Sequence, residues 1–173
     1  MSYVEILILR RLHGGPAHGY ELGKRVEETT GFVLHNNSLY PALRRFEEAG
    51  AVTKAAEPQE GRPPRLVYTL TDVGRDLLHD MLAELPDEQA GQPEEFMARL
   101  GQFSLLNSAE RAGVLAARAR SVRAQLAHYE VMHKLAVDHG ERWGARATAE
   151  LIRRHQQELT WLAELGELAK DEP

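Results

Sequence analysis

Residues 38–50 have the sequence SLYPALRRFEEAG and predict the helix around which the fold is organised. Leu39, Leu43 and Phe46 recur at the spacing of helical turns, so they share one apolar face. Arg44 falls on the opposite, polar face. Such a helix can anchor itself inward through its apolar residues while presenting polar side chains to a partner.

The ends of this helix follow from residues that suit helix termini. The glycine that closes the motif is a typical C-terminal stop. Pro41 has no amide hydrogen and fits best in the first turn, which favours Ser38 or Asn37 as the N-cap, with Asn36 as a chemically suitable alternative. We therefore expect a helix over residues 36–49.

Two shorter helices are expected before this one. Residues 2–12 are apolar nearly all round, which indicates a mostly buried helix, and His13-Gly-Gly-Pro ends it. A second helix is expected over residues 17–30, with Leu22 and Val26 one turn apart on its inner face. A glycine follows and stops it.

Two strands are expected after the motif, at residues 51–56 and 66–71. The second is rich in β-branched and aromatic residues, and a turn-rich loop with Pro and Gly separates the two. Thr71 or Asp72 then caps a fourth helix that runs to about Leu85. Three short helices followed by a β-hairpin form the pattern of a winged helix-turn-helix domain.

The second half of the chain is expected to be helical. The segment 85–93 is polar, acidic and interrupted by prolines, and we interpret it as the boundary between the halves. A short helix is expected over residues 94–106. Asn107 then caps a long helix, with Glu110 completing a capping box, and a last long helix is expected over residues 142–169.

The two long helices carry apolar and small residues at alternating spacings of four and three. Helices with such a seam form an antiparallel pair, and the imperfections of this seam favour bundle packing over a regular coiled coil. The pair leaves apolar surface uncovered, which predicts a homodimer joined through these helices. The seam positions are Leu115, Ala119, Val122, Leu126, Tyr129, His133 and Ala136, then Thr148, Ile152, His155, Leu159, Leu162, Gly166 and Ala169.

The predicted fold is therefore mainly α-helical with a small β-hairpin. It combines an N-terminal winged helix-turn-helix domain for DNA binding, residues 1–85, with a C-terminal antiparallel helical domain for dimerisation, residues 93–173.

The composition limits the function classes. The chain has 173 residues, of which 43% are hydrophobic and 27% charged, as in ordinary globular proteins. No apolar run is long enough for a membrane span or a signal-peptide core, so we expect a cytoplasmic protein without a membrane partner. The lack of cysteine removes disulfides, thiolate catalysis and Cys-based zinc sites. A net charge of −5 argues against coating nucleic acid by bulk charge but leaves a local basic surface open.

Segments of the first half, in order, resemble the PadR family of bacterial transcription regulators. The resemblance is carried by residues 18–22 (HGYEL), 38–50 (SLYPALRRFEEAG), 61–68 (GRPPRLVY) and 70–75 (LTDVGR). The second half is similar only in length and helical character to the longer members of the family.

The resemblance implies a dimeric regulator, usually a repressor, that often releases its DNA when it binds a small hydrophobic or aromatic effector. The chain departs from the family at two places. Residues 35–37 are His-Asn-Asn where family members often have Ser-Pro-Gly, which affects the entry to the helix. Leu66 and Val67 stand where family wings often carry further basic or aromatic residues, which puts extra contacts between wing and phosphate in doubt.

Candidate DNA contacts combine cations, hydroxyls and amides. Arginine can form paired hydrogen bonds with guanine or with phosphate, and a helix N-terminus favours an anion. Arg62 and Arg65 flank a Pro-Pro pair, which would stiffen the tip of the hairpin. Two cations there could contact the minor groove of DNA or its phosphates. The predicted contacts to a palindromic double-stranded operator are Tyr20, Lys24, Asn36, Asn37, Ser38, Tyr40, Pro41, Arg44, Arg45, Arg62, Arg65 and Tyr68.

Simpler roles are open for several of these residues. The polar residues at 36–38 can serve only as helix caps. Arg44 and Arg45 precede Glu47 and Glu48, so they can form ion pairs along a solvated helix face. Tyr68 lies in a strand and is as well suited to the core as to a phosphate.

Other chemistry is poorly supported. His128, His133 and His139 lack the spacing of a helical metal pair, and no phosphate-binding glycine loop, nucleophile elbow or dinucleotide motif occurs, so we expect no metal, cofactor or catalytic site. His133 and His155 are interpreted first as packed or paired residues. Aromatic residues of the second half are candidates for an effector pocket or for core: Phe96, Phe103, Tyr129, Trp143 and Trp161.

Two alternatives to a DNA-binding regulator stay open. One is a winged-helix module for protein–protein interaction that has lost DNA binding, which the acidic total charge and the departures in the wing suggest. The other is a small helical enzyme, which only the histidines suggest.

Overall fold

The computed structural model describes residues 2–31, 34–59 and 62–171. Also outside the described part are the side chains of Thr29, Thr30, Gln59, Arg62, Pro63 and Asp171. The chain divides into two compact units, Met1–Leu82 and Ala83–Pro173. Charge is divided unevenly: the first unit has ten Lys and Arg against eleven Asp and Glu, and the second has eleven against fifteen.

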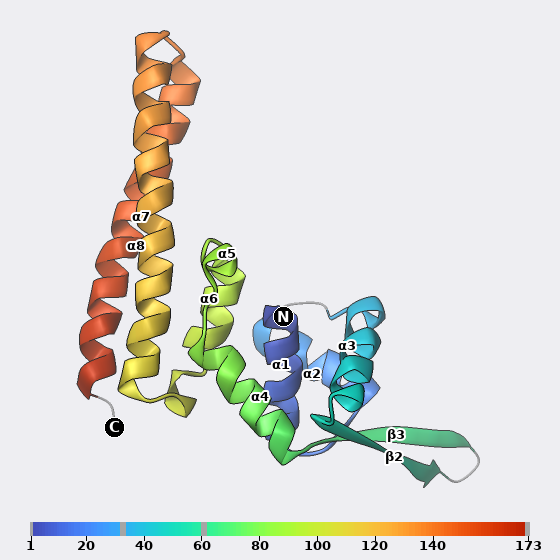
Figure 1. The fold of residues 1–173 in the computed structure, drawn as a ribbon. Coiled ribbons are helices and arrows are strands. Elements are labelled where there is room, and N and C mark those ends of the chain that lie inside the picture. Colours follow the sequence, from blue (N-terminus) through green and yellow to red (C-terminus); the bar gives the residue numbers. More distant parts are fainter. Residues whose placement is uncertain (1, 32–33, 60–61, 172–173) are drawn as a thin grey trace. The chain divides into compact units, whose positions relative to one another are not determined.

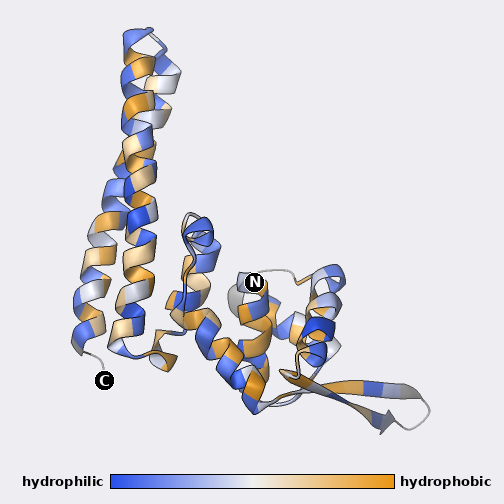
Figure 2. Cartoon of the chain, in the orientation of Figure 1, coloured by the Kyte–Doolittle hydropathy of each residue, from blue (hydrophilic) through white to orange (hydrophobic). Residues whose placement is uncertain are grey.

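The first unit packs its helices around one core. Figure 2 shows α1 as hydrophobic along most of its length. Ile8, Leu22, Leu39 and Leu82 come from four different helices, and each is at most 1% exposed. Full burial of such a side chain contributes roughly 1.5–3 kcal/mol, so this core holds the helices in place. In order the unit contains α1 (Tyr3–His13), β1 (Ala17–His18), α2 (Gly19–Thr30), α3 (Asn36–Glu48), β2 (Val52–Gln59), β3 (Arg62–Leu70) and α4 (Asp72–Ala83) (Figure 1).

The sheet has three antiparallel strands in the order β1-β3-β2. β2 and β3 form the expected hairpin, called the wing below, and pair from Val52 with Leu70 to Glu57 with Arg65. The prediction that residue 17 begins a helix was wrong. Ala17 pairs with Tyr68 of β3 and is buried, so pairing with the sheet overrides the local preference for helix.

The N-terminus of α3 also differs from the prediction. His35 is the N-cap, and its carbonyl accepts hydrogen bonds from the amides of Ser38 and Leu39. Asn36 is therefore the first helical residue, and none of the three predicted caps has that role. Pro41 lies inside the helix rather than in its first turn. Its missing amide leaves the carbonyl of Asn37 without the usual helical donor, which this exposed end of the helix tolerates.

Gly74 in the first turn of α4 explains one segment of the LTDVGR motif. A Cβ atom at this position would overlap the carbonyl oxygen of Ala51. The amide of Thr71 also donates to that oxygen, and the Thr71 hydroxyl donates to the carbonyl of Gly50. The close approach fixes α4 against the start of the wing.

The second unit is a long helical hairpin with a short helical segment against its base. It contains α5 (Asp87–Ala90), α6 (Pro93–Leu100), a 3-10 turn (Phe103–Leu105), α7 (Ser108–Asp138) and α8 (Arg142–Asp171). Asn107 caps α7, and Glu110 closes the capping box as predicted. Gly140, with φ of 72°, makes the turn into α8. Within the ranges described, no helix has a stretch long and apolar enough to cross a membrane.

Two details of the second unit depart from expectation. Residues 85–93, interpreted as the boundary between the halves, lie inside the second unit, where Leu85 and Ala90 are buried with Val114. The single helix expected over 94–106 is split into α6 and the 3-10 turn. Arg111 donates to the carbonyl of Phe103 over 2.8 Å, which supports the break.

The predicted seam is where α7 and α8 meet. Leu115, Val122 and Ala136 of α7 are buried, as are Leu162 and Ala169 of α8. The two seam histidines are hydrogen-bonded, as interpreted. His133 Nδ1 lies 3.0 Å from the Thr148 hydroxyl, and His155 Nε2 lies 2.9 Å from Gln125 Oε1.

Candidate nucleic-acid interface

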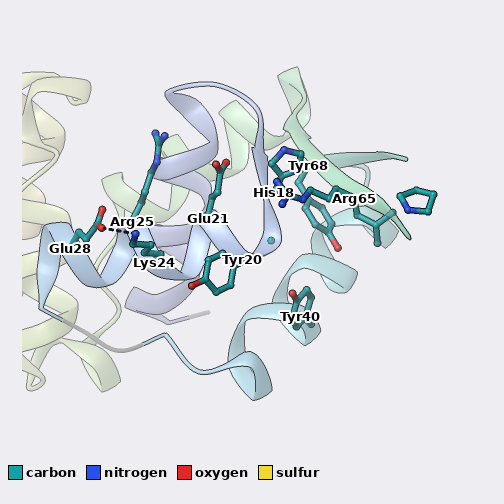
Figure 3. A pocket seen from close by; sticks show the side chains of 12 residues that line it. His18, Tyr20, Glu21, Lys24, Arg25, Glu28, Tyr40, Arg65 and Tyr68 are labelled. Atoms are coloured by element: carbon teal, nitrogen blue, oxygen red, sulfur yellow. Dashed lines mark ion pairs between the residues drawn. The ribbon is translucent and has the colours of Figure 1, made fainter. Parts of the chain in front are cut away.

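A groove of about 750 Å³ opens beside the start of α2, where α3 and β3 also contribute side chains (Figure 3). It brings together five of the predicted DNA contacts, which the chain holds up to 48 positions apart. Its walls combine three phenol rings with Lys24, Arg25 and Arg65, and they also carry the carboxylates of Glu21 and Glu28. Cations exceed carboxylates, so the groove can take an anionic strand that also offers flat surfaces. The five are Tyr20, Lys24, Tyr40, Arg65 and Tyr68.

The tyrosines of the groove differ in role. Tyr20 is 79% exposed, whereas Tyr40 packs closely over Gly19 at the N-terminus of α2. A Cβ atom on Gly19 would come within 3.0 Å of Tyr40 Cε1, so the glycine allows α3 to approach α2. Tyr68 is only 5% exposed, and burial raises the pKa of its phenol, which therefore stays neutral. Tyr68 is thus mainly a core residue that borders the groove.

The outward strip of α3 is as the sequence predicted. Asn36, Asn37, Ser38, Pro41 and Arg44 are all exposed. Within the described residues Arg44 forms no ion pair, so its guanidinium is available to an external partner. Arg44 can therefore reach a base edge or phosphate without first breaking an ion pair to a described residue.

Arg45 has a different role from the one predicted. Its Nη2 donates to Oε1 of Glu5 in α1 over 2.7 Å. Glu5 is only 7% exposed, so its carboxylate is held in place by the surrounding protein. Arg45 therefore joins α3 to α1, and DNA contact would compete with this bond.

The wing is attached to α3 by a lysine that the prediction missed. Lys54 Nζ in β2 donates to Oε2 of Glu47 over 2.7 Å. This hydrogen bond raises the pKa of Lys54. This ion pair could not be predicted from the sequence. Lys54 lies on a strand and Glu47 on a helix, and only the packing of the two elements shows that their side chains meet.

The remaining cations lie on α2 and on the wing. Lys24 is exposed and 3.7 Å from Glu28 one turn away, a surface pair that contributes little to stability. Arg65 is exposed on β3. The prediction for Arg62 falls outside the described residues, because only its backbone at the start of β3 is described.

Residues 8–80 match the family of transcriptional regulators described as PadR-like. The first unit is therefore similar to PadR-like regulators over most of its length. The negative transcriptional regulator PadR of Bacillus subtilis is 28% identical over 112 residues, which cover 64% of this chain and 62% of that protein. A protein from a Streptomyces fradiae transposon is 38% identical over 74 residues, 43% of this chain and 20% of that protein. The chain thus spans less than two thirds of the length of these curated relatives.

Solved structures include further PadR proteins. A PadR family transcription regulator from Clostridium difficile is 32% identical, with 46% of this chain and 82% of that chain covered and a TM-score of 0.42. Bacillus subtilis PadR in complex with operator DNA is 23% identical, with 98% of each chain covered and a TM-score of 0.46. The match to PadR-like regulators supports the predictions of a transcription regulator and of a chain that is not an enzyme.

The five aromatic residues proposed for an effector pocket do not all lie together. Phe96 is a core residue in edge contact with Trp161, their ring centroids 6.0 Å apart. Tyr129 packs on His155 farther along the hairpin, and Trp143 is 83% exposed near its turn. Phe103 is half-buried against the core. Among the residues that the structure describes, no group of three or more His, Asp or Glu could hold a metal ion.

Proposed function

We propose that this PadR-like chain is a sequence-specific DNA-binding regulator that acts as a homodimer. The observation that carries the proposal is the strip of α3 with Asn37, Pro41 and Arg44 turned to solvent, where Arg44 has no ion-pair partner among the described residues, together with the groove that holds Lys24 and Arg65. α3 would enter the major groove of a palindromic operator, where Arg44 can form two hydrogen bonds with one guanine.

The groove beside α2 would hold the DNA backbone. Lys24 and Arg65 supply charge for phosphates, and Tyr20 and Tyr40 supply hydroxyl donors. The wing would follow the adjacent minor groove or its phosphates. Since phosphates would carry much of the affinity, binding should weaken steeply with added salt.

The second unit would join two copies. A shallow apolar groove of about 300 Å³ lies on the α7–α8 hairpin between Leu115, Ala119, Leu159 and Leu162. Val131, Met132 and Leu135 leave more apolar surface uncovered on α7. Pairing through these helices would hide this surface and set two copies of α3 about 34–36 Å apart, one turn of DNA.

Repression with release by a small hydrophobic or aromatic molecule is the mode of control that we propose. Support comes from relatives alone: the Bacillus subtilis protein is a negative regulator, and its structure has been solved with operator DNA and with p-coumaric acid. An effector would lower affinity by favouring a dimer whose two reading helices no longer match successive major grooves. A DNA partner also makes the cytoplasm the place of action.

The test is a fluorescence-anisotropy titration of the full chain with DNA from upstream of its own gene, against a shuffled duplex of equal length. We expect preference for the upstream DNA and an affinity that falls steeply between about 50 and 200 mM salt. Arg44→Ala should cost about 1–3 kcal/mol of operator binding and relax sequence preference. A protein–protein interaction module would give no salt-sensitive binding to either duplex, and that result would refute the proposal.

A further inference from the structure

Glu57 on the wing has a histidine and an arginine as neighbours, and within the described residues its carboxylate lies in contact with the histidine alone. It stands directly opposite Arg65 in the β2–β3 pairing, the arrangement that brings cross-strand side chains together. Its carboxylate instead lies 3.5 Å from Nε2 of His18, which comes from β1 on the far side of β3.

The strand register explains how His18 reaches across the sheet. His18 is opposite Val67, and Val67 is opposite Ala55, so the three lie in one row on the same face. Glu57 is two positions beyond Ala55 and therefore points to that face as well. The imidazole thus crosses over β3 and meets the carboxylate diagonally.

The surroundings of His18 define which ring nitrogen carries the proton. Nδ1 is buried and has no hydrogen-bond partner within the described residues. A proton placed there would be a buried donor without an acceptor, which is costly. The N–H of the neutral ring is therefore on Nε2, the atom that faces Glu57.

The position of the Glu57 carboxylate decides whether the Arg65 guanidinium is paired or available. Arg65 is exposed, lines the groove beside α2 and forms no ion pair with any described residue. A carboxylate that turned to Arg65 would neutralise one of the few cations on the wing. We propose that His18 is a positioning residue that holds Glu57 away from Arg65, and so keeps the Arg65 guanidinium free for a DNA phosphate. This inference rests on the proposed function.

The test compares His18→Leu, Glu57→Gln and the double variant in operator binding by the full chain. His18→Leu should weaken binding about two- to fivefold, the range for an exposed cross-strand ion pair, and reduce the salt dependence by up to about one phosphate contact. Glu57→Gln should bind as well as the parent or better. The double variant should match Glu57→Gln, because no carboxylate is left to neutralise Arg65.

A conservative variant and a measurement without DNA guard against a simple folding defect. His18→Gln keeps an N–H donor and should bind like the parent. In the DNA-free protein, NMR should show the Arg65 Nε–H exchanging more slowly with water in His18→Leu, and this protection should vanish in the double variant. Equal losses from His18→Leu with and without Glu57 would overturn the inference. If no variant and not even the parent binds DNA, the proposed function fails, and the NMR comparison still decides whether His18 holds Glu57.

Discussion

Arg45 of α3 and Glu5 of α1 are joined by a hydrogen bond of 2.7 Å between Nη2 and Oε1. The second oxygen of Glu5 accepts from the Ser2 amide at 2.8 Å, so both carboxylate oxygens are engaged. Two adjacent arginines on one helix therefore have different roles: Arg45 holds the helix in the fold, and Arg44 stays available.

This difference can be measured with a matched pair of variants. Arg45→Ala leaves the largely buried Glu5 without its main partner, which should cost about 1–2 kcal/mol of unfolding free energy. Arg44→Ala should change stability by less than about 0.5 kcal/mol while weakening DNA binding more. Thermal unfolding and DNA titration of both variants give the comparison. Equal losses of stability would contradict the assignment of Arg45 to the fold.

Gly74→Ala should destabilise the first unit strongly. The added methyl group would overlap the Ala51 carbonyl oxygen, a backbone atom that cannot turn away. Overpacking of this kind costs about 1–3 kcal/mol, in spite of the better helix propensity of alanine. Gly113→Ala is the control, because nothing lies within 4 Å of a Cβ atom there and the change should stabilise α7. Denaturant unfolding that ranked the two variants the other way would refute this account.

Arg118→Met should destabilise the second unit. Arg118 is buried, donates to the Ala90 carbonyl at 2.8 Å and pairs with Glu158 at 2.7 Å. Removing one partner of such a pair costs about 3–5 kcal/mol when both are buried, and less here because Glu158 is partly exposed. A second change, Glu158→Leu, should recover part of the loss. Chemical unfolding of the parent and the three variants measures the coupling, and strictly additive losses would argue against it.

Acid should weaken α8 through Glu150. Hydrogen bonds from Arg153 and Arg154 lower the pKa of this carboxyl from 4.5 to about 2. A lowered folded-state pKa means that the contribution to stability is present above pH 4.5 and is lost as the pH falls towards 2. The difference in thermal stability between the parent and Glu150→Gln should therefore shrink between these two pH values and stay constant above them. A difference that is the same at pH 2 and pH 6 would contradict this prediction.

Much of the architecture could be predicted from local pattern alone. Apolar residues of α3 and of the α7–α8 hairpin recur with the period of a helix. Asn107 and Glu110 have the spacing of a capping box and so predict the start of a helix. β1 could not be predicted, because Ala17 becomes a strand residue only through its partner Tyr68 in distant β3. The polar residues at 36–38 are all chemically suitable caps, and nothing in their order reveals that His35 takes that position.

The sequence predicted which residues lie at the candidate site better than it predicted what each residue does there. Charge and position suggested Arg44 and Arg45 equally, and only the packing of α1 against α3 separates them. The aromatic residues of the second unit were grouped by composition, whereas the hairpin spreads them from its core to its exposed turn. Ion pairs between elements, such as Lys54 with Glu47, depend on tertiary directions that spacing does not encode.

The uneven division of acidic residues between the two units bears on how such a protein would search a genome. A nearly neutral reading unit attached to an acidic helical unit gains little long-range attraction to a polyanion. Encounters with random sequence would then be brief, since non-specific affinity is almost entirely electrostatic. Less protein would be held on the excess of irrelevant sites, and a modest number of molecules would be enough to fill one matching site.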